Sequence, residues 1–187
     1  MRFIIIFIFF ISSLNIIGQE FHTIFKYEDS FNNSITIQNS FTKGGLTYTA
    51  PNGDEYIYVI FWTSIINDGN SDLELSIDFP TISFTVPTSP NVKFNLYVPN
   101  DEMTFNKDLL FNYGLDLESY LDKNLGRQSK YVKTISPNQS HQFYVIALSN
   151  QRVNGVVRAG FELENQDLKY KINGYKMSCG RLTTQND

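Results

Sequence analysis

Apolar and polar residues alternate with a period of two along most of the chain after Phe21, a pattern typical of β-strands that bury one face. Residues 73–79 give the clearest example, because every second residue from Leu73 to Phe79 is apolar and the residues between them are polar. Similar alternation occurs at residues 82–86, 92–98, 157–163 and 168–172. The pattern predicts an all-β fold of antiparallel sheets with a shared core.

Three short polar segments predict turns between these strands. Residues 51–54 and 67–70 contain Asn-Gly and Asp-Gly pairs, which tolerate the positive φ angles of short hairpin loops. We therefore expect both segments to close β-hairpins, the first leading into a strand at Tyr56 and the second into the strand at Leu73. Residues 165–167 are expected to join the last two strands.

Residues 56–66 differ from the other strands because both of their faces are apolar. Tyr56, Tyr58 and Trp62 lie on one face, and Val59 and Phe61 lie on the other. A strand of this kind must be covered on both sides or leave an apolar patch exposed. The candidate cover is the segment 105–126, where the strand pattern fails.

Within that segment the sequence predicts one short amphipathic helix. Asp116 can cap its N-terminus and Gly126 can end it. Its apolar residues recur at helical spacing and share one face: Leu117, Tyr120, Leu121 and Leu125. We expect this helix to pack on the sheet or its rim; the alternative is an element that binds a partner.

The N-terminal residues have the pattern of an export signal. Arg2 precedes an unbroken apolar run over residues 3–11, and the small residue Gly18 follows. We expect a signal peptide at residues 1–18, a mature chain that begins at Gln19, and a periplasmic or extracellular location. The apolar run is short for a bilayer, so a retained signal anchor is the weaker alternative and no stable membrane insertion is expected.

The remaining residues are expected to form one domain. It spans residues 19–182, with the helical insertion near 105–126, and a polar tail follows at 183–187. The net charge of −4, with lysines scattered singly, argues against a nucleic-acid partner. Cys179 is the only cysteine, so no intramolecular disulfide can form, and a buried thiol is favoured over intermolecular pairing.

Two local motifs resemble those of exported bacterial immunoglobulin-like β-sandwich proteins. Residues 65–75 (IINDGNSDLEL) are similar to an N-x-G and L-x-L strand-turn-strand motif, and residues 135–140 (ISPNQS) resemble an I-x-P-G-x-S segment that leads into a strand, with Asn138 in place of the glycine. Residues 17–19 also resemble the signal-peptide exits of one group of Gram-negative bacteria. The resemblance implies an antiparallel immunoglobulin-like β-sandwich and no particular activity. An up-and-down β-barrel is the alternative fold.

Motifs for catalysis or metal binding do not rise above background, and we expect no catalytic residue, metal or cofactor. Residues 68–72 have alternate oxygen ligands like a calcium loop, but Leu73 stands where glycine is required and Phe79 stands where glutamate is required. Ser140 and His141 are adjacent on a predicted strand, so their side chains point to opposite faces. The acidic residues between 101 and 122 are expected to be solvated.

Aromatic side chains remain as the candidate binding residues. Tyr56, Tyr58 and Trp62 share a strand face, and an exposed face of this kind can stack on sugars or anchor a protein. Core packing is the competing interpretation, which holds if the helix covers them. We expect a non-enzymatic exported binding or structural module that contacts an envelope or extracellular protein or glycan. The alternatives are an extracytoplasmic hydrolase, with His22 or His141 against an acid, and a carrier of a small apolar ligand.

Overall fold

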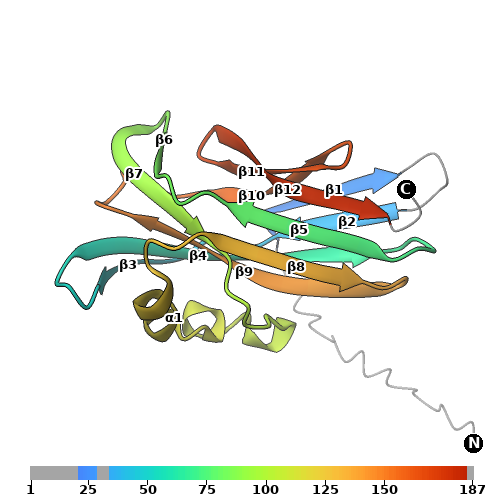
Figure 1. The fold of residues 1–187 in the computed structure, drawn as a ribbon, viewed down its shortest axis with the longest axis horizontal. Coiled ribbons are helices and arrows are strands. Elements are labelled where there is room, and N and C mark those ends of the chain that lie inside the picture. Colours follow the sequence, from blue (N-terminus) through green and yellow to red (C-terminus); the bar gives the residue numbers. More distant parts are fainter. Residues whose placement is uncertain (1–20, 29–33, 185–187) are drawn as a thin grey trace, which may run out of the picture.

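A computed structural model describes residues 21–28 and 34–184 and shows an all-β architecture with one short α-helix (Figure 1). The all-β prediction is therefore confirmed. The expected signal peptide at residues 1–18 and the start of the mature chain at Gln19 lie outside the described residues. The last strand extends to Thr184, into the segment that was expected to be a polar tail.

The larger sheet has seven strands and places residues 55–67 at its centre. Its hydrogen-bonded order is β1-β2-β4-β9-β7-β6, and β3 pairs with β4 alongside β2. All its pairings are antiparallel. The strands are β1 (Thr23–Glu28), β2 (Ser34–Asn39), β3 (Lys43–Thr49), β4 (Glu55–Asn67), β6 (Phe84–Val86), β7 (Ser89–Tyr97) and β9 (Gln139–Ser149).

The smaller sheet has five strands and faces the larger one. Its order is β10-β11-β12-β5-β8, again antiparallel throughout. The strands are β5 (Leu73–Phe79), β8 (Ser129–Ile135), β10 (Ala159–Glu164), β11 (Asp167–Ile172) and β12 (Tyr175–Thr184). In β5, buried and exposed residues alternate strictly along the whole strand, as the sequence predicts.

The turns at residues 51–54 and 165–167 are confirmed, but the hairpin predicted at 67–70 is wrong. β3 and β4 pair across the first turn, and β10 and β11 pair across the other. β4 and β5, in contrast, lie in different sheets, so the chain crosses between the sheets at residues 68–72. Asn67 fixes this crossing, because its side-chain amide donates to the carbonyl of Ile135 at 2.9 Å and to that of Ser71 at 2.9 Å.

The six consecutive strands β4 to β9 form three antiparallel pairs that lie alternately in the larger and the smaller sheet. β4 pairs with β9, β5 pairs with β8, and β6 pairs with β7, so each pair is nested inside the previous one. Immunoglobulin domains instead place strands A, B, E and D in one sheet and C, F and G in the other. An up-and-down barrel requires neighbours that follow one another in sequence. The all-β class is thus shown, whereas the immunoglobulin-like topology is not confirmed.

The main core lies between the two sheets. Its side chains come from the inward faces of both sheets, and Phe61, Phe79, Phe143, Phe161 and Tyr170 are among its largest members. All five are 2% exposed or less. Burial of aromatic area on this scale is the main favourable contribution to folding a chain without disulfides.

The side chain of Asn39 joins the two sheets where their edge strands β1 and β10 approach each other. Its amide nitrogen donates to the carbonyl of Phe161 at 3.0 Å, and its oxygen accepts from the N–H of Phe161 at 2.9 Å. The amide nitrogen also donates to Thr23 and the oxygen accepts from Thr63, so all its hydrogen-bonding positions are used. Nearby, the hydroxyl of Tyr27 accepts from the N–H of Leu163 at 2.9 Å. Side chains of the larger sheet thus pair with the outer backbone edge of β10.

A helical layer covers the opposite face of the larger sheet (Figure 1). It consists of two 3₁₀ turns, η1 (Phe105–Lys107) and η2 (Phe111–Gly114), and of α1 (Leu117–Asn124). Asp116 caps α1 by accepting from the N–H of Ser119, and Leu117 and Leu121 face the sheet. The predicted helix is confirmed. The molecule therefore has three layers, with the larger sheet in the middle.

Candidate functional site

The three aromatic residues proposed from sequence as a binding face lie beneath the helical layer. Trp62 is 0% exposed and Tyr58 is 5% exposed, while Tyr56 is partly buried. The indole ring of Trp62 packs edge-on against Phe105, with ring centroids 5.6 Å apart. A partner cannot reach Trp62 or Tyr58 in this arrangement, so the structure corrects their assignment as surface binding residues. Residues 105–113 of the helical layer contact them, and both belong to a second core.

Hydrogen bonds fix the helical layer to the sheet. The indole N–H of Trp62 donates to the carboxylate of Asp108 at 2.8 Å. Three tyrosines of the sheet also bond to the layer. The hydroxyl of Tyr48 donates to Asp122 at 2.7 Å, and the hydroxyl of Tyr144 donates to the carbonyl of Tyr113 at 2.8 Å. The hydroxyl of Tyr58 accepts from the side-chain amide of Asn112 at 3.0 Å. Burial raises the pKa of Tyr144 to about 12, so its phenol remains a donor. The layer is therefore a fixed part of the fold.

A left-handed turn lies at the centre of the layer. Asn112, Tyr113 and Gly114 have φ angles of 50°, 54° and 68°. This conformation costs roughly 1–2 kcal/mol for each residue that carries a Cβ, so surrounding contacts must hold it. Tyr113 supplies several: its hydroxyl donates to the carbonyl of Phe41 at 2.7 Å, and the ammonium of Lys43 lies 4.0 Å from the centre of its ring.

The same turn exposes a group of large apolar side chains to solvent. We call Phe105, Leu109, Leu110 and Phe111 the apolar strap; they are 42%, 89%, 51% and 73% exposed. Exposed single apolar residues are ordinary, but four within seven residues form a local concentration that marks interaction surfaces. Sequence reasoning missed the strap because it assigned the whole segment to covering the sheet. Three consecutive apolar residues, Leu109 to Phe111, are the signal that could have revealed it, because a short cover cannot bury all of them.

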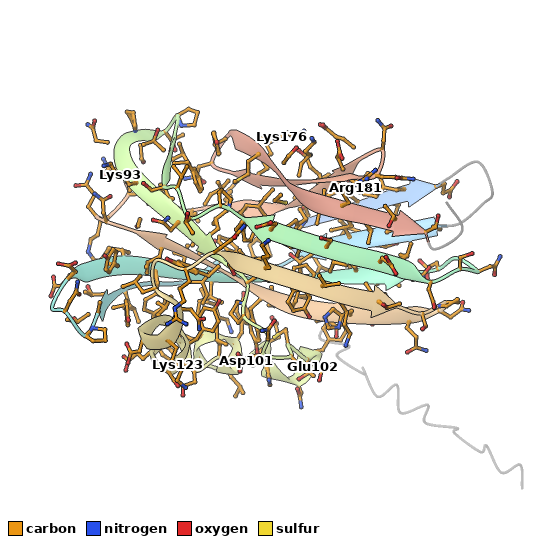
Figure 2. The ribbon with its side chains drawn as sticks, viewed as in Figure 1. Lys93, Asp101, Glu102, Lys123, Lys176 and Arg181 are labelled. Atoms are coloured by element: carbon orange, nitrogen blue, oxygen red, sulfur yellow. The ribbon has the colours of Figure 1, made fainter. Side chains whose placement is uncertain are left out.

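Acidic residues surround the apolar strap. Residues 101–126 contain six carboxylates and two lysines, a net charge of −4 that equals the formal charge of the entire chain. Figure 2 shows Asp101, Glu102 and Lys123 on the side of the molecule that carries the helical layer. Asp108 and Asp122 are engaged with Trp62 and Tyr48. The segment that carries the apolar strap therefore has an excess of negative charge, which Lys43 of β3 offsets in part where its ammonium donates to the carbonyls of Asp108 and Leu110.

His141 lies near the start of β9, in a stack of rings with Tyr131 and Phe143. It is 8% exposed, and its Nε2 is hydrogen-bonded to the hydroxyl of Tyr131. Burial lowers the pKa of His141, the charge of Lys133 lowers it further, and Glu102 opposes the shift. Burial also raises the pKa of Tyr131. A neutral imidazole whose Nε2 accepts a hydrogen bond from a neutral phenol is consistent with both pKa shifts.

This pairing predicts a pH dependence of stability. Because the folded pKa of His141 lies below its unfolded value of about 6.5, the unfolded chain binds the proton more readily. The stabilising effect of the neutral ring is complete above that value and is lost as the pH falls toward the folded pKa. Urea unfolding at about pH 7.5 and about pH 5 should show a larger loss of stability in the wild type than in His141→Gln. Equal losses in both proteins would contradict this assignment.

The other groups considered for catalysis are not arranged for it. The Ser140 hydroxyl accepts from Gln142 rather than facing His141, and His22 packs against Phe41 with ring centroids 5.8 Å apart. Burial lowers the pKa of His22, and the charge of Arg158 adds to this effect. Cys179 is buried and donates to the carbonyl of Leu168 at 3.3 Å, and burial raises the pKa of its thiol. Within residues 21–28 and 34–184, no group of three or more His, Cys, Asp or Glu side chains could hold a metal ion.

Comparison with known proteins supplies no relative. No protein-family model matches the chain, and neither a curated protein nor a solved structure matches it significantly. Among the helices in the described part of the chain, none is long and apolar enough to cross a membrane.

Proposed function

We propose that this chain is an exported, non-enzymatic module that binds a protein in the envelope or outside the cell through the apolar strap. The N-terminal pattern of residues 1–18 supports export, and the resemblance of residues 65–75 and 135–140 to exported immunoglobulin-like proteins supports the same interpretation. The observation that carries the proposal is the exposure of Phe105, Leu109, Leu110 and Phe111 on a layer that is otherwise firmly fixed.

The rigidity of the layer favours recognition. A left-handed turn held by Tyr113 and Asn112 presents Phe111 from a defined backbone, so little conformational freedom of the backbone is lost on binding. Large apolar side chains that are already positioned are typical of the anchors that contribute most to protein interfaces.

The side chains of the strap favour a protein partner over a glycan. Sugar recognition uses flat aromatic rings beside polar groups, whereas Leu109 and Leu110 are aliphatic. The negative charge of residues 101–126 favours a partner whose apolar patch is rimmed by lysine or arginine. The sequence also left a glycan as a possible partner, but no observation on this surface favours a glycan.

The test compares partner capture by two variants of the full chain. Leu109→Ser combined with Phe111→Ser removes the two most exposed members of the strap, and we expect capture of envelope protein to fall by at least about tenfold, because truncating interface anchors typically costs more than 1.4 kcal/mol. Stability should change by about 0.5 kcal/mol or less, because both side chains are exposed. Quantitative pull-down and urea unfolding give the two measurements.

Val132→Ser is the matched control. Val132 is 76% exposed on β8 of the smaller sheet, away from the helical layer, and its replacement should leave capture unchanged. A photo-crosslinking residue at position 111 should join the partner directly, at a basic and apolar surface, whereas the same residue at position 132 should not. Equal capture by the strap variant and the wild type would refute the proposal.

A further inference from the structure

A second candidate site is a cleft between edge strands β1 and β10. It has a volume of about 290 Å³ and is open to solvent. Phe25 of β1 forms one wall, and Ala159 and Gly160 of β10 form the other. Gly174, in the turn between β11 and β12, closes one end. The cleft does not involve the apolar strap, so the inference is independent of the proposed function.

Small residues keep this cleft open over a firm base. A Cβ atom added at Gly160 would lie 2.6 Å from the side chain of Asn39, so no larger residue fits there without displacing the amide that joins the sheets. Asn173 fixes the rim, because its side-chain oxygen accepts from the N–H of Arg158 at 2.8 Å and its own N–H donates to the carbonyl of Arg158 at 3.0 Å. The cleft is therefore preformed by backbone and buried polar contacts.

The charged side chains around the cleft are predominantly basic. Arg158 and Lys171 line it, both are exposed, and neither forms an ion pair with the described residues. Glu162 is the one carboxylate in the lining, and its oxygen lies 2.6 Å from the ammonium of Lys176, which also pairs with Glu164 at 2.5 Å. His22 completes the rim as a further N–H donor. An apolar wall thus stands beside two positive charges that form no ion pair within residues 21–28 and 34–184.

We propose that this cleft binds a small organic acid, with its apolar body between Phe25 and the β10 backbone at Ala159 and Gly160 and its carboxylate between Arg158 and Lys171. The volume suits a molecule of about ten to fifteen non-hydrogen atoms, at the small end of ligand pockets. A guanidinium can hold a carboxylate through two hydrogen bonds, and the lysine adds a point charge. Binding follows from charge complementarity at a preformed apolar surface.

Three probes with the same apolar body and different charge test the proposal. Titrations of the full chain with 3-phenylpropionate, 3-phenylpropanol and 3-phenylpropylamine are followed by amide chemical shifts in nuclear magnetic resonance spectra. We expect the acid to bind with a dissociation constant of about 1 mM or below, the alcohol to bind at least about tenfold more weakly, and the amine to bind weakest. The largest shifts should occur at Gly160 and Gly174. Added salt should weaken the binding of the acid and of neither of the other two probes.

Variants of the two cations separate this site from non-specific binding. In the double variant Arg158→Gln and Lys171→Gln, the affinity for the acid should fall to that for the alcohol, and the affinity for the alcohol should not change. The melting temperature should stay the same, because both side chains are exposed. Lys93→Gln is the matched control: Lys93 (Figure 2) lies on β7, far from β1 in the strand order and outside the cleft. Equal binding of acid and alcohol, shifts outside the cleft, or undiminished binding of the acid by the double variant would each overturn the proposal.

Discussion

Replacing Trp62 with alanine is expected to lower the free energy of unfolding by about 3–5 kcal/mol, the usual cost of removing a fully buried large aromatic side chain. Trp62 is 0% exposed, contacts Phe105, Phe21 and Tyr113 through its ring, and donates to Asp108. Its loss leaves a cavity between the larger sheet and the helical layer and removes the donor for a partly buried carboxylate. Urea unfolding followed by far-ultraviolet circular dichroism measures the change.

Two further variants show which part of the effect comes from the helical layer. Phe111→Ala removes an aromatic side chain of the same layer that is 73% exposed, so it should cost little stability. Trp62→Phe keeps most of the buried apolar area and lacks the indole N–H, so its cost should fall between the two. A near-neutral Trp62→Ala would show that the helical layer does not pack on this strand as described.

Replacing Asn39 with alanine should lower the free energy of unfolding by about 2–6 kcal/mol, because two buried backbone groups lose their partners and each unsatisfied group costs about 1–3 kcal/mol. These groups are the N–H and the carbonyl of Phe161, and the hydroxyl of Thr63 also loses its acceptor. The smaller sheet would lose one of its direct polar links to the larger one at this edge, while the bond between Tyr27 and Leu163 would remain. Hydrogen exchange should increase first at the N–H of Phe161, and chemical unfolding gives the total cost.

Asn95→Ala is the control for this effect. The amide of Asn95 also donates to a backbone carbonyl, that of Thr81 at 3.0 Å, but the bond is exposed and water can replace it. We expect a cost of about 0.5 kcal/mol or less. If the two alanine variants have similar stability, Asn39 does not join the sheets in the way that its four hydrogen bonds indicate.

Local patterns predicted the elements well because each depends on nearby residues. The alternation from Leu73 to Phe79 defines a strand with one buried face, and Asp116 does cap the helix. Even the replacement of a motif glycine by Asn138 has a local explanation, since Asn138 has a φ of 59°, a conformation that asparagine tolerates better than most residues. The apolar character of both faces of β4 correctly indicated that a further layer covers it.

The pairing of the strands was harder to predict from the sequence, because alternation shows which face of a strand is buried and does not show which strand lies beside it. Residues 67–70 have a hairpin-like sequence, yet the chain crosses to the other sheet there because Asn67 bonds to Ile135, 68 residues away. The apolar strap follows from the left-handed turn at Asn112 and Tyr113, and tertiary contacts impose that turn. The cleft between β1 and β10 brings together residues that lie far apart in the sequence, such as Phe25 and Arg158.

The contacts of Asn39 and Tyr27 with β10 have a consequence for self-assembly. An exposed strand edge can recruit further copies of a chain into cross-β aggregates, because its unpaired N–H groups form a template. At Phe161 and Leu163 those N–H groups are already bonded to side chains of the same molecule. Fibril growth from the β10 edge would first have to break the contact between the sheets, so the residues that close the fold also block this edge as a template.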